Sequence, residues 1–253
     1  MILAILGAVV AAVLFWIFVP GPVDAVLGRV LPIALEPVAS RQFGGFLLAI
    51  TLGAGGIAMS LPLGILLALG RQSDMFLIKT FSIMFIEFIR GVPLITLLFV
   101  ASLLLNYFLP PGTNFDIILR VMILVTLFSA AYIAEVIRGG LAALPRGQYE
   151  AADALGLDYW KAQRLVILPQ ALKISIPGIV STFISMFKDT TLVTFVGLFE
   201  PLKSIPDSIR ADIAWKGTYW EHFIFVGAIF FILNFSMSRY SMYLERKLKR
   251  DHR

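Results

Sequence analysis

The sequence of 253 residues contains no cysteine and only two histidines, His222 and His252. The lack of cysteine excludes disulfide bonds, thiol catalysis and cysteine-ligated metal sites. Two histidines also argue against a histidine-rich metal centre. Charged residues are scarce as well, at 15% of the chain, whereas about 25% is usual in soluble domains. An apolar chain with so little charge does not have the composition of a disordered protein.

Apolar residues, by contrast, are in excess, because they account for 59% of the chain and give a mean hydropathy of +0.89. Ordinary soluble domains are about 45–50% apolar. A water-soluble globule of this size cannot hide that much apolar surface, so the solvent must be lipid. The sequence therefore predicts an all-α, polytopic membrane protein, a bundle of about six transmembrane helices.

Six stretches are long and apolar enough to cross a bilayer, for which a helix needs about 20 residues. They are residues 1–23, 42–70, 91–115, 117–134, 174–199 and 223–238. We interpret 1–23 as a transmembrane segment and not as a signal peptide, because it lacks a basic beginning and a small-residue cleavage site. Residues 72–90 mix charged and apolar side chains, which is typical either of an amphipathic helix at the cytoplasmic interface or of a plain loop.

The basic residues predict the orientation of these spans. With the C-terminus in the cytoplasm and the spans alternating, 14 of the 21 Lys and Arg lie on the cytoplasmic side, five lie outside and two lie within spans. Because cytoplasmic loops are enriched in Lys and Arg, both termini are expected in the cytoplasm. The same bias accounts for the pI of 9.6 without nucleic acid, for which the chain has no folded basic domain. The basic tail from Arg239 onward is expected to attract anionic lipid headgroups and to act chiefly as a topology anchor.

The most informative segment is the cytoplasmic loop 145–170, between the fourth and fifth predicted spans. Glu150-Ala151-Ala152 favours a short helix that Gly156 can end. A second helical run is predicted over Tyr159–Ile167, ending at Leu168-Pro169. A short helix, a glycine turn and a returning helix make a rigid projection suited to docking on a cytoplasmic partner. From these residues alone, a loop that packs on its own bundle is an equal alternative.

This loop resembles a known family motif. The order Glu150-Ala151-Ala152, three residues, Gly156, nine residues, Val166, one residue, Leu168-Pro169 is similar to the EAA loop of ABC importer permeases, with Val166 where the family usually has isoleucine. Three further stretches are similar to the polar amino acid permeases within that family, namely Arg90-Gly91-Val92-Pro93-Leu94, Ala131-Tyr132-Ile133-Ala134-Glu135 running into Arg138-Gly139-Gly140, and Lys188-Asp189-Thr190-Thr191-Leu192. The chain looks most like the subunits of broad-specificity L-amino-acid importers.

The resemblance covers residues 43–245 and implies the fold of a type I ABC importer permease. It makes 43–245 the permease core, with the coupling loop at 145–170, and 246–253 a basic cytoplasmic tail. Residues 1–42 lie outside the shared core and are expected to be an additional transmembrane helix with its periplasmic connection. In this family the residues corresponding to Glu150, Ala151, Ala152 and Gly156 form a coupling helix that seats in a groove of an ATP-binding subunit.

The resemblance also implies partners and a location. A second permease subunit is expected to complete the translocation path, in a heterodimer rather than a homodimer. Two ATP-binding subunits would bind ATP and Mg, and a periplasmic amino-acid-binding protein would deliver the substrate. The complex is expected in the bacterial inner membrane.

The chain itself is not expected to be an enzyme. It contains no Gly-Lys dipeptide and therefore no G-x4-G-K-[ST] phosphate-binding loop. We expect no catalytic site, cofactor or metal in it, so that energy must come from a partner ATPase or from an ion gradient. The alternative function is therefore an ion-driven secondary amino acid transporter or channel that works alone. Such a protein would be expected to have an internal repeat, and 1–120 and 121–253 show no convincing one.

Lys188-Asp189 is an adjacent pair of opposite charges deep in the fifth predicted span. Charges there cost at least about 2.5–3.5 kcal/mol each, so they persist where they are paired or line a wet cavity. Adjacent helical residues point about 100° apart, so the two side chains should not face the same way. Because a free amino acid is a zwitterion, we predict that Lys188, Asp189, Thr190 and Thr191 line the substrate path. A structural ion pair between helices is the alternative.

Two other pairs of opposite charge stand three residues apart, as neighbours on a helix do. They are Glu87 with Arg90, and Glu135 with Arg138 near the cytoplasmic end of the fourth predicted span. Both are expected to be ion pairs, and a gate is the alternative role for the second pair.

Overall fold

The computed structural model describes residues 39–104 and 116–250 of the chain. The chain divides into two compact units, Met1–Ala39 and Ser40–Arg253, so the described part belongs almost wholly to the second. The predicted first span, 1–23, lies outside the described residues, as does most of the N-terminal region expected to precede the permease core.

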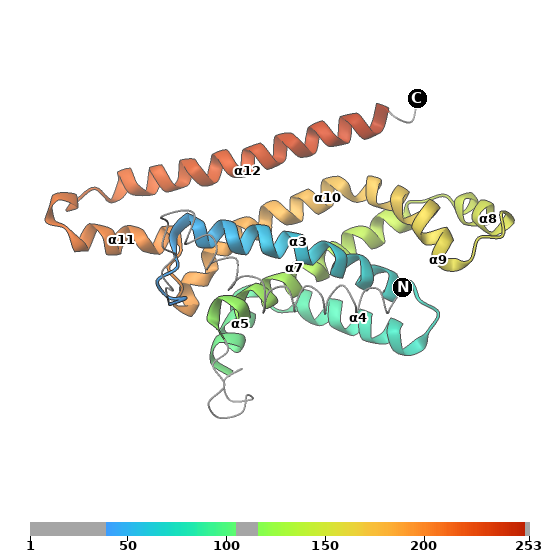
Figure 1. Ribbon diagram of the computed structural model, residues 1–253, viewed down its shortest axis with the longest axis horizontal. Helices are drawn as coiled ribbons and strands as arrows, with labels where there is room; N and C mark the ends of the chain where they lie inside the picture. Colours follow the sequence, from blue (N-terminus) through green and yellow to red (C-terminus); the bar gives the residue numbers. More distant parts are fainter. Residues whose placement is uncertain (1–38, 105–115, 251–253) are drawn as a thin grey trace, which may run out of the picture. The chain divides into compact units, whose positions relative to one another are not determined.

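The second unit is built from helices, and no strand occurs in its described residues. In chain order the α-helices are α3 (Gly45–Gln72), α4 (Phe76–Gly91), α5 (Leu94–Phe99), α7 (Ile117–Ala142), α8 (Arg146–Ala154), α9 (Tyr159–Ala162), α10 (Leu168–Asp189), α11 (Pro201–Ala211) and α12 (Tyr219–Arg250) (Figure 1). Shorter turns complete the set, with π-helical geometry at Val100–Leu104 and Gln163–Ile167 and 3₁₀ geometry at Thr190–Val196 and Ile213–Trp215. The predicted all-α fold is confirmed.

Four helices in the described part are long and apolar enough to cross a membrane. They are α3, α7, a continuous helix of 38 residues over Tyr159–Val196, and α12 as far as Leu248. α7 contains the whole predicted span 117–134, and α12 contains the whole predicted span 223–238. α3 begins three residues after the start of the predicted span 42–70.

The predicted third span, 91–115, does not begin as a straight helix. α4 ends at Gly91 and Pro93 is the N-cap of α5, because a proline has no N–H to continue the helix and disfavours helical geometry in the residue before it. The two arms meet at 101° and would make a fifth crossing if they form one broken span. The helix predicted within 72–90 is therefore present, and it packs against α3 and α7. Residues 105–115 lie outside the described part.

The prediction that the helical run after Gly156 ends at Leu168-Pro169 is wrong. The chain passes from α9 through the π-helical turn Gln163–Ile167 directly into α10. Pro169 lies in the first turn of α10, where a missing N–H breaks no hydrogen bond within that helix. The part of the predicted loop from Tyr159 onward and the membrane helix that follows it are therefore parts of the same continuous helix.

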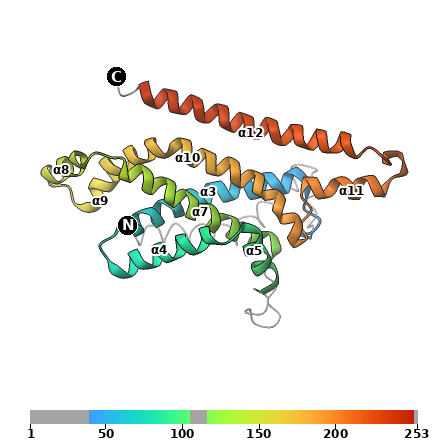
Figure 2. The same cartoon turned by 180° about the vertical axis from the view of Figure 1, so that it is seen from behind.

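α3, α7 and α10 lie side by side and form the centre of the unit (Figures 1 and 2). Their close contacts depend on small residues, which let membrane helices approach each other. A Cβ atom on Gly64 of α3 would lie 2.9 Å from the Cβ of Ile133 on α7. A Cβ atom on Gly140 of α7 would lie 2.6 Å from the carbonyl oxygen of Ala171 on α10.

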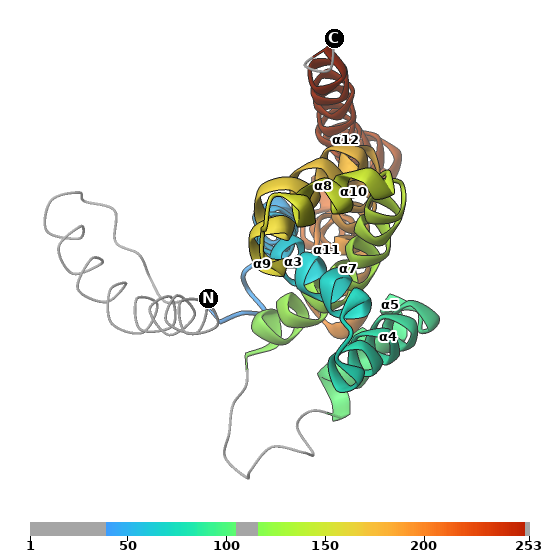
Figure 3. The same ribbon diagram turned by 90° about the vertical axis from the view of Figure 1, so that its right-hand side faces the viewer.

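α12 and the pair α4–α5 lie on opposite sides of this centre (Figure 3). α12 contacts α10 and α11, and its Val226 is buried with Ile205 and Ile209 of α11. α11 begins at a buried carboxylate, Glu200, which accepts hydrogen bonds from the N–H groups of Leu202 at 2.9 Å and Lys203 at 2.6 Å. Burial raises the pKa of Glu200, although these two N–H donors oppose the shift.

Candidate functional site

α8 and α9 project beyond the ends of α3 and α7 and carry the motif of the coupling loop (Figure 1). On α8, Glu150 and Ala151 are exposed, whereas Ala152 is only 1% exposed. The motif therefore has two faces, one available to a partner and one packed on the chain itself. Gly156 is also exposed and follows the end of the helix.

The end of α8 explains why a glycine stands at position 156. Gly156 has a φ of +68°, in the left-handed region that other residues rarely adopt. Its N–H donates to the carbonyl of Asp153 at 2.9 Å, and the N–H of Leu157 donates to the carbonyl of Ala152 at 3.2 Å. These two bonds form a Schellman motif, which satisfies carbonyls that the helix leaves free. The prediction that Gly156 ends this helix is confirmed.

A side-chain hydrogen bond joins α8 to α10, and another caps α9. The Nε2 atom of Gln170 on α10 donates to the Oε1 atom of Gln148 on α8 across 2.9 Å. The Asp158 carboxylate caps α9 by accepting a hydrogen bond from the N–H of Lys161. This hydrogen bond lowers the pKa of Asp158. One face of α8 therefore packs on the bundle, whereas Glu150 and Ala151 are exposed, and the docking of a partner on this loop stays a prediction.

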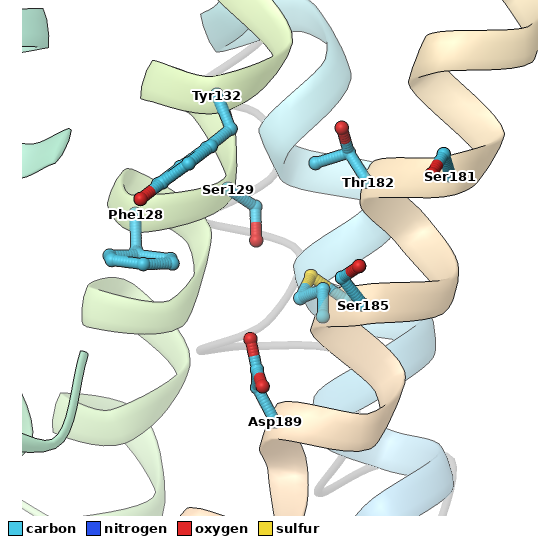
Figure 4. A pocket seen from close by; sticks show the side chains of 8 residues that line it. Phe128, Ser129, Tyr132, Ser181, Thr182, Ser185 and Asp189 are labelled. Atoms are coloured by element: carbon cyan, nitrogen blue, oxygen red, sulfur yellow. The ribbon is translucent and has the colours of Figure 1, made fainter. Parts of the chain in front are cut away.

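A cavity of about 250 Å³ lies between α7 and α10 (Figure 4). Its lining is mostly hydroxyl-bearing or aromatic and includes one carboxylate: Phe128, Ser129 and Tyr132 from α7, with Ser181, Thr182, Ser185, Met186 and Asp189 from α10. Figure 4 places Tyr132 and Asp189 toward opposite ends of this cavity. It is smaller than the pockets of about 300–1,000 Å³ that hold drug-sized ligands, so its size suits a smaller molecule.

Lys188 and Asp189 face different cavities, as the 100° step between adjacent helical residues predicts. Asp189 lines the cavity between α7 and α10, whereas Lys188 lines another, of about 640 Å³, with residues of α12 such as Asn234. The described residues contain no ion pair between Lys188 or Asp189 and a neighbouring helix, which was the structural alternative. The substrate-path role of both residues stays a prediction.

The two threonines after this pair do not join the hydroxyl groups of the cavity beside Asp189. The Thr190 hydroxyl is buried and donates to the carbonyl of Phe187 at 2.7 Å. The Thr191 hydroxyl donates to the carbonyl of Lys188 at 2.9 Å, and Thr191 lines the cavity beside α12. The hydroxyl groups that accompany Asp189 come instead from residues that sequence reasoning did not single out. Their signal is the helical spacing of Ser181, Ser185 and Asp189, four residues apart along one face.

A cluster of five charged residues, which we call the arginine cluster, joins α3, α4 and α7. It contains three guanidinium groups and two carboxylates, from Arg71, Arg90, Arg138, Glu87 and Glu135. The predicted pairs Glu87–Arg90 and Glu135–Arg138 are both present, although the first is long at 4.0 Å. The contribution of Arg71 was missed, because no local spacing relates it to Glu135. Among the described residues no group of three or more His, Asp or Glu could hold a metal ion.

Comparison with known proteins assigns this arrangement of helices to a family. A model described as the binding-protein-dependent transport system inner membrane component matches residues 60–250. The chain belongs to this family. It has the fold of the type I ABC importer permeases, and a solved structure described as an amino acid ABC transporter with histidines is 31% identical, with a TM-score of 0.68 over 79% of this chain and 91% of that one.

Two curated members of the permease family match nearly the whole chain. The glutamate/glutamine/aspartate/asparagine transport system permease protein BztC of Rhodobacter capsulatus is 75% identical over 98% of this chain and 57% of its own length. The inner membrane amino-acid ABC transporter permease protein YhdY of Escherichia coli is 48% identical over 96% of this chain and 70% of its own length. The chain thus spans little more than half the length of its relative BztC.

Proposed function

We propose that this chain is a membrane-spanning subunit of an ATP-driven importer that moves polar L-amino acids inward across the bacterial inner membrane. The supporting observation is the two-faced helix α8, which is held to α10 by Gln170 and Gln148 and leaves Glu150 and Ala151 exposed. A helix anchored on one side and free on the other suits a subunit that receives movement from a partner. The ATPase would act there, since the sequence has no phosphate-binding loop of its own.

The proposed substrates are glutamate, aspartate and their amides. This choice is supported by the 75% identity to BztC, a glutamate/glutamine/aspartate/asparagine transport system permease, and by a cavity lined by Ser129, Ser185 and the carboxylate of Asp189. The carboxylate suits the ammonium group that all amino acids carry, and the hydroxyl groups suit their polar atoms. Lys188, Thr190 and Thr191 would belong to the wall of the path behind this cavity.

The proposed complex contains a second permease subunit in a heterodimer, two ATP-binding subunits that bind ATP and Mg, and a periplasmic amino-acid-binding protein. Both termini of the chain would be cytoplasmic, which places α8 and α9 on the side of the ATPase. The alternative, an ion-driven transporter working alone, requires no ATPase on the exposed face of α8.

The test is purification of the chain from its native membrane in mild detergent, followed by reconstitution into liposomes. We expect an ATPase and a second permease to co-purify, and we expect uptake of radiolabelled L-glutamate or L-glutamine to require ATP on the α8 side. Uptake driven by an ion gradient without any ATPase would contradict the proposal.

A variant of the turn after α8 sharpens the test. Gly156→Val places a β-branched residue at a φ of +68°, which such residues rarely adopt. We expect the variant to insert and to pair with the second permease, while substrate-stimulated ATP hydrolysis is lost. Gly147→Ala is the control, because a Cβ atom at Gly147 would meet nothing within 4 Å. Full substrate-stimulated ATP hydrolysis in Gly156→Val would show that α8 does not couple the ATPase to transport.

A further inference from the structure

We propose that a cavity at the base of α8 and α9, which we call the coupling cavity, receives an Arg or Lys side chain of the partner ATPase. The inference rests on the proposed function and adds a contact that the exposed face of α8 does not provide. The coupling cavity has a volume of about 340 Å³. Its lining includes one residue of α3, two of α8, one of α9 and two of the π-helical turn that follows: Gln72, Tyr149, Asp153, Tyr159, Gln163 and Ile167.

The charge of the coupling cavity favours a cation. Asp153 contributes a carboxylate, and no Lys or Arg is among the described residues that line the cavity. None of the ion pairs in the described part of the chain involves Asp153. Of the nearest cations in the sequence, Arg71 pairs with Glu87 and Glu135, and the Nζ atom of Lys161 lies 3.0 Å from the Asp158 carboxylate. The Asp153 carboxylate therefore stays available to a cation from outside the chain.

The ends of two helices add to this negative potential. Gln72 is the last residue of α3, and Asp153 is the last but one of α8. The carbonyl groups in the last turn of a helix together act as roughly half a negative charge, so they stabilise cations nearby. The coupling cavity thus combines one full negative charge with two partial ones.

The aromatic side chains suit the same occupant. Tyr149 and Tyr159 both line the coupling cavity, and the face of an aromatic ring attracts a guanidinium or ammonium group. Gln163 is only 6% exposed and Ile167 is fully buried, so that part of the lining is shielded from water. Charge pairing with Asp153 is stronger where water is partly excluded.

The surroundings of the coupling cavity indicate a protein as the source of the cation. Leu155 is 76% exposed and Trp160 is 50% exposed, although both lie in the projection beyond α3 and α7. The Trp160 ring contacts the ring of Tyr159, with 5.3 Å between the ring centres. Large apolar side chains left exposed on such a projection mark a protein interface, and a charged anchor surrounded by apolar contacts is typical of one. A free cation would leave these apolar side chains uncovered.

A side chain in the coupling cavity would contact the starting points of two membrane helices. Gln72 ends α3, and Ile167 directly precedes α10. Gln163 and Ile167 belong to a π-helical turn, a local geometry that often occurs at functional sites. A basic side chain held there would therefore transmit a movement of the ATPase to α3 and α10 directly, in addition to its effect through α8.

The test measures how tightly the purified ATPase binds the two permease subunits, reconstituted together in lipid nanodiscs at low salt. For Asp153→Asn we expect the dissociation constant to rise roughly tenfold, whereas Asp153→Glu, which keeps the charge, should change it by less than about threefold. Asp153 is exposed, so both variants should fold. The difference between Asp153→Asn and wild type should shrink in about 1 M salt, which screens charges beyond about 3 Å.

Two substitutions of Gln163 separate a cation site from a structural role. Gln163→Glu adds an anion of nearly the same shape and should tighten binding of the ATPase. Gln163→Lys supplies a cation from the chain itself and should weaken binding roughly tenfold or more. A purely structural role would make both variants weaken binding alike. If neither Gln163 variant assembles, the Asp153 series decides the matter by itself.

The basic residue of the ATPase is identified by double-mutant cycles. Each Arg and Lys on the ATPase surface is replaced by Gln and tested against wild type and against Asp153→Asn. We expect one basic residue whose replacement weakens binding to wild type but adds little to the effect of Asp153→Asn, because the two residues act as a pair.

Unchanged binding in Asp153→Asn, equal weakening by both Gln163 variants, or no basic residue that couples to Asp153 would each overturn the inference. ATPase binding that depends on an added free cation, such as Mg²⁺ or spermidine, and on no basic residue of the ATPase would also overturn it. These results leave the proposed function standing. A wild-type permease pair that binds no ATPase would overturn both.

Discussion

The Nη1 atom of Arg71 donates a hydrogen bond to the Oε2 atom of Glu135 across 3.1 Å, although the two residues are 64 positions apart in the chain. Arg138 donates to the other oxygen of the same carboxylate, with its Nε atom at 2.9 Å. Arg90 approaches Oε2 at 3.6 Å. Glu135 is therefore the common partner of three guanidinium groups on three helices, and it ties α3 and α4 to α7.

Replacing Glu135 by Gln should destabilise the subunit by about 1–3 kcal/mol, because three guanidinium groups lose the negative charge that they share and an NH₂ donor replaces one of its two acceptor oxygens. Thermal unfolding of the purified complex in detergent measures the change. Glu87→Gln is the control, since that carboxylate is about half exposed and bonds only Arg71 at short distance. An equal loss of stability in the two variants would contradict the central position of Glu135.

Two adjacent glycines of α7 should respond oppositely to alanine. Gly139→Ala adds a Cβ atom in open space and should be neutral or stabilising by up to about 1 kcal/mol through helix propensity. Gly140→Ala places its Cβ atom 2.6 Å from the carbonyl oxygen of Ala171 and should lower the unfolding temperature, because α7 and α10 must separate. A stable Gly140→Ala variant would show that these helices can move apart at little cost.

Substitutions of Ala151 and Ala152 should distinguish an effect on the stability of the fold from an effect on the docking of the ATPase. Ala152→Leu puts three extra carbons into a packed site that is 1% exposed, and overpacking costs typically about 1–3 kcal/mol. Its thermal stability should therefore fall. Ala151→Leu is exposed and should leave stability unchanged while reducing the amount of ATPase that co-purifies. If Ala151→Leu retains the full amount of ATPase, the exposed face of α8 is not the docking surface.

The two adjacent charges at the end of α10, Lys188 and Asp189, should also differ in effect. Asp189→Asn removes the carboxylate that the described residues contribute to the cavity between α7 and α10 and should lower the maximal uptake rate by roughly tenfold or more, a loss of about 1.4 kcal/mol per factor of ten. Lys188→Met changes the cavity beside α12 and should have a smaller effect. Recovery of the full complex by gel filtration checks assembly. Equal uptake by wild type and Asp189→Asn would argue against a pocket role.

Local pattern was enough to predict several features of this site. The end of α8 at Gly156 follows from the helix-forming residues before it and the freedom of glycine after it. The divergence of Lys188 and Asp189 follows from the angle between neighbouring helical positions. In both cases the deciding interaction lies within a few residues of the chain.

The sequence did not predict contacts between helices that are far apart in the chain, nor the effect of two prolines on the helices around them. The contact of Arg71 with Glu135 requires α3 and α7 to be side by side, which no spacing in the sequence states. Pro169 was expected to end a helix, but the π-helical turn before it brings the chain into a new first turn that tolerates proline. Pro93 has the opposite effect, since it follows Val92 in extended geometry and bends the chain.

The continuous helix Tyr159–Val196 has a mechanical consequence. It is held close to α7 near its middle, where Gly140 meets Ala171 and Gly178 meets Val136. A rigid helix that is held near its middle can rotate only about that contact. Trp160 lies eleven residues before Ala171 and Asp189 lies eleven after Gly178, so the two arms are each about 16 Å long. If this helix rotates as a rigid body about these contacts, a displacement of the arm that carries Trp160 produces a displacement of about the same size, in the opposite direction, of the arm that carries Asp189.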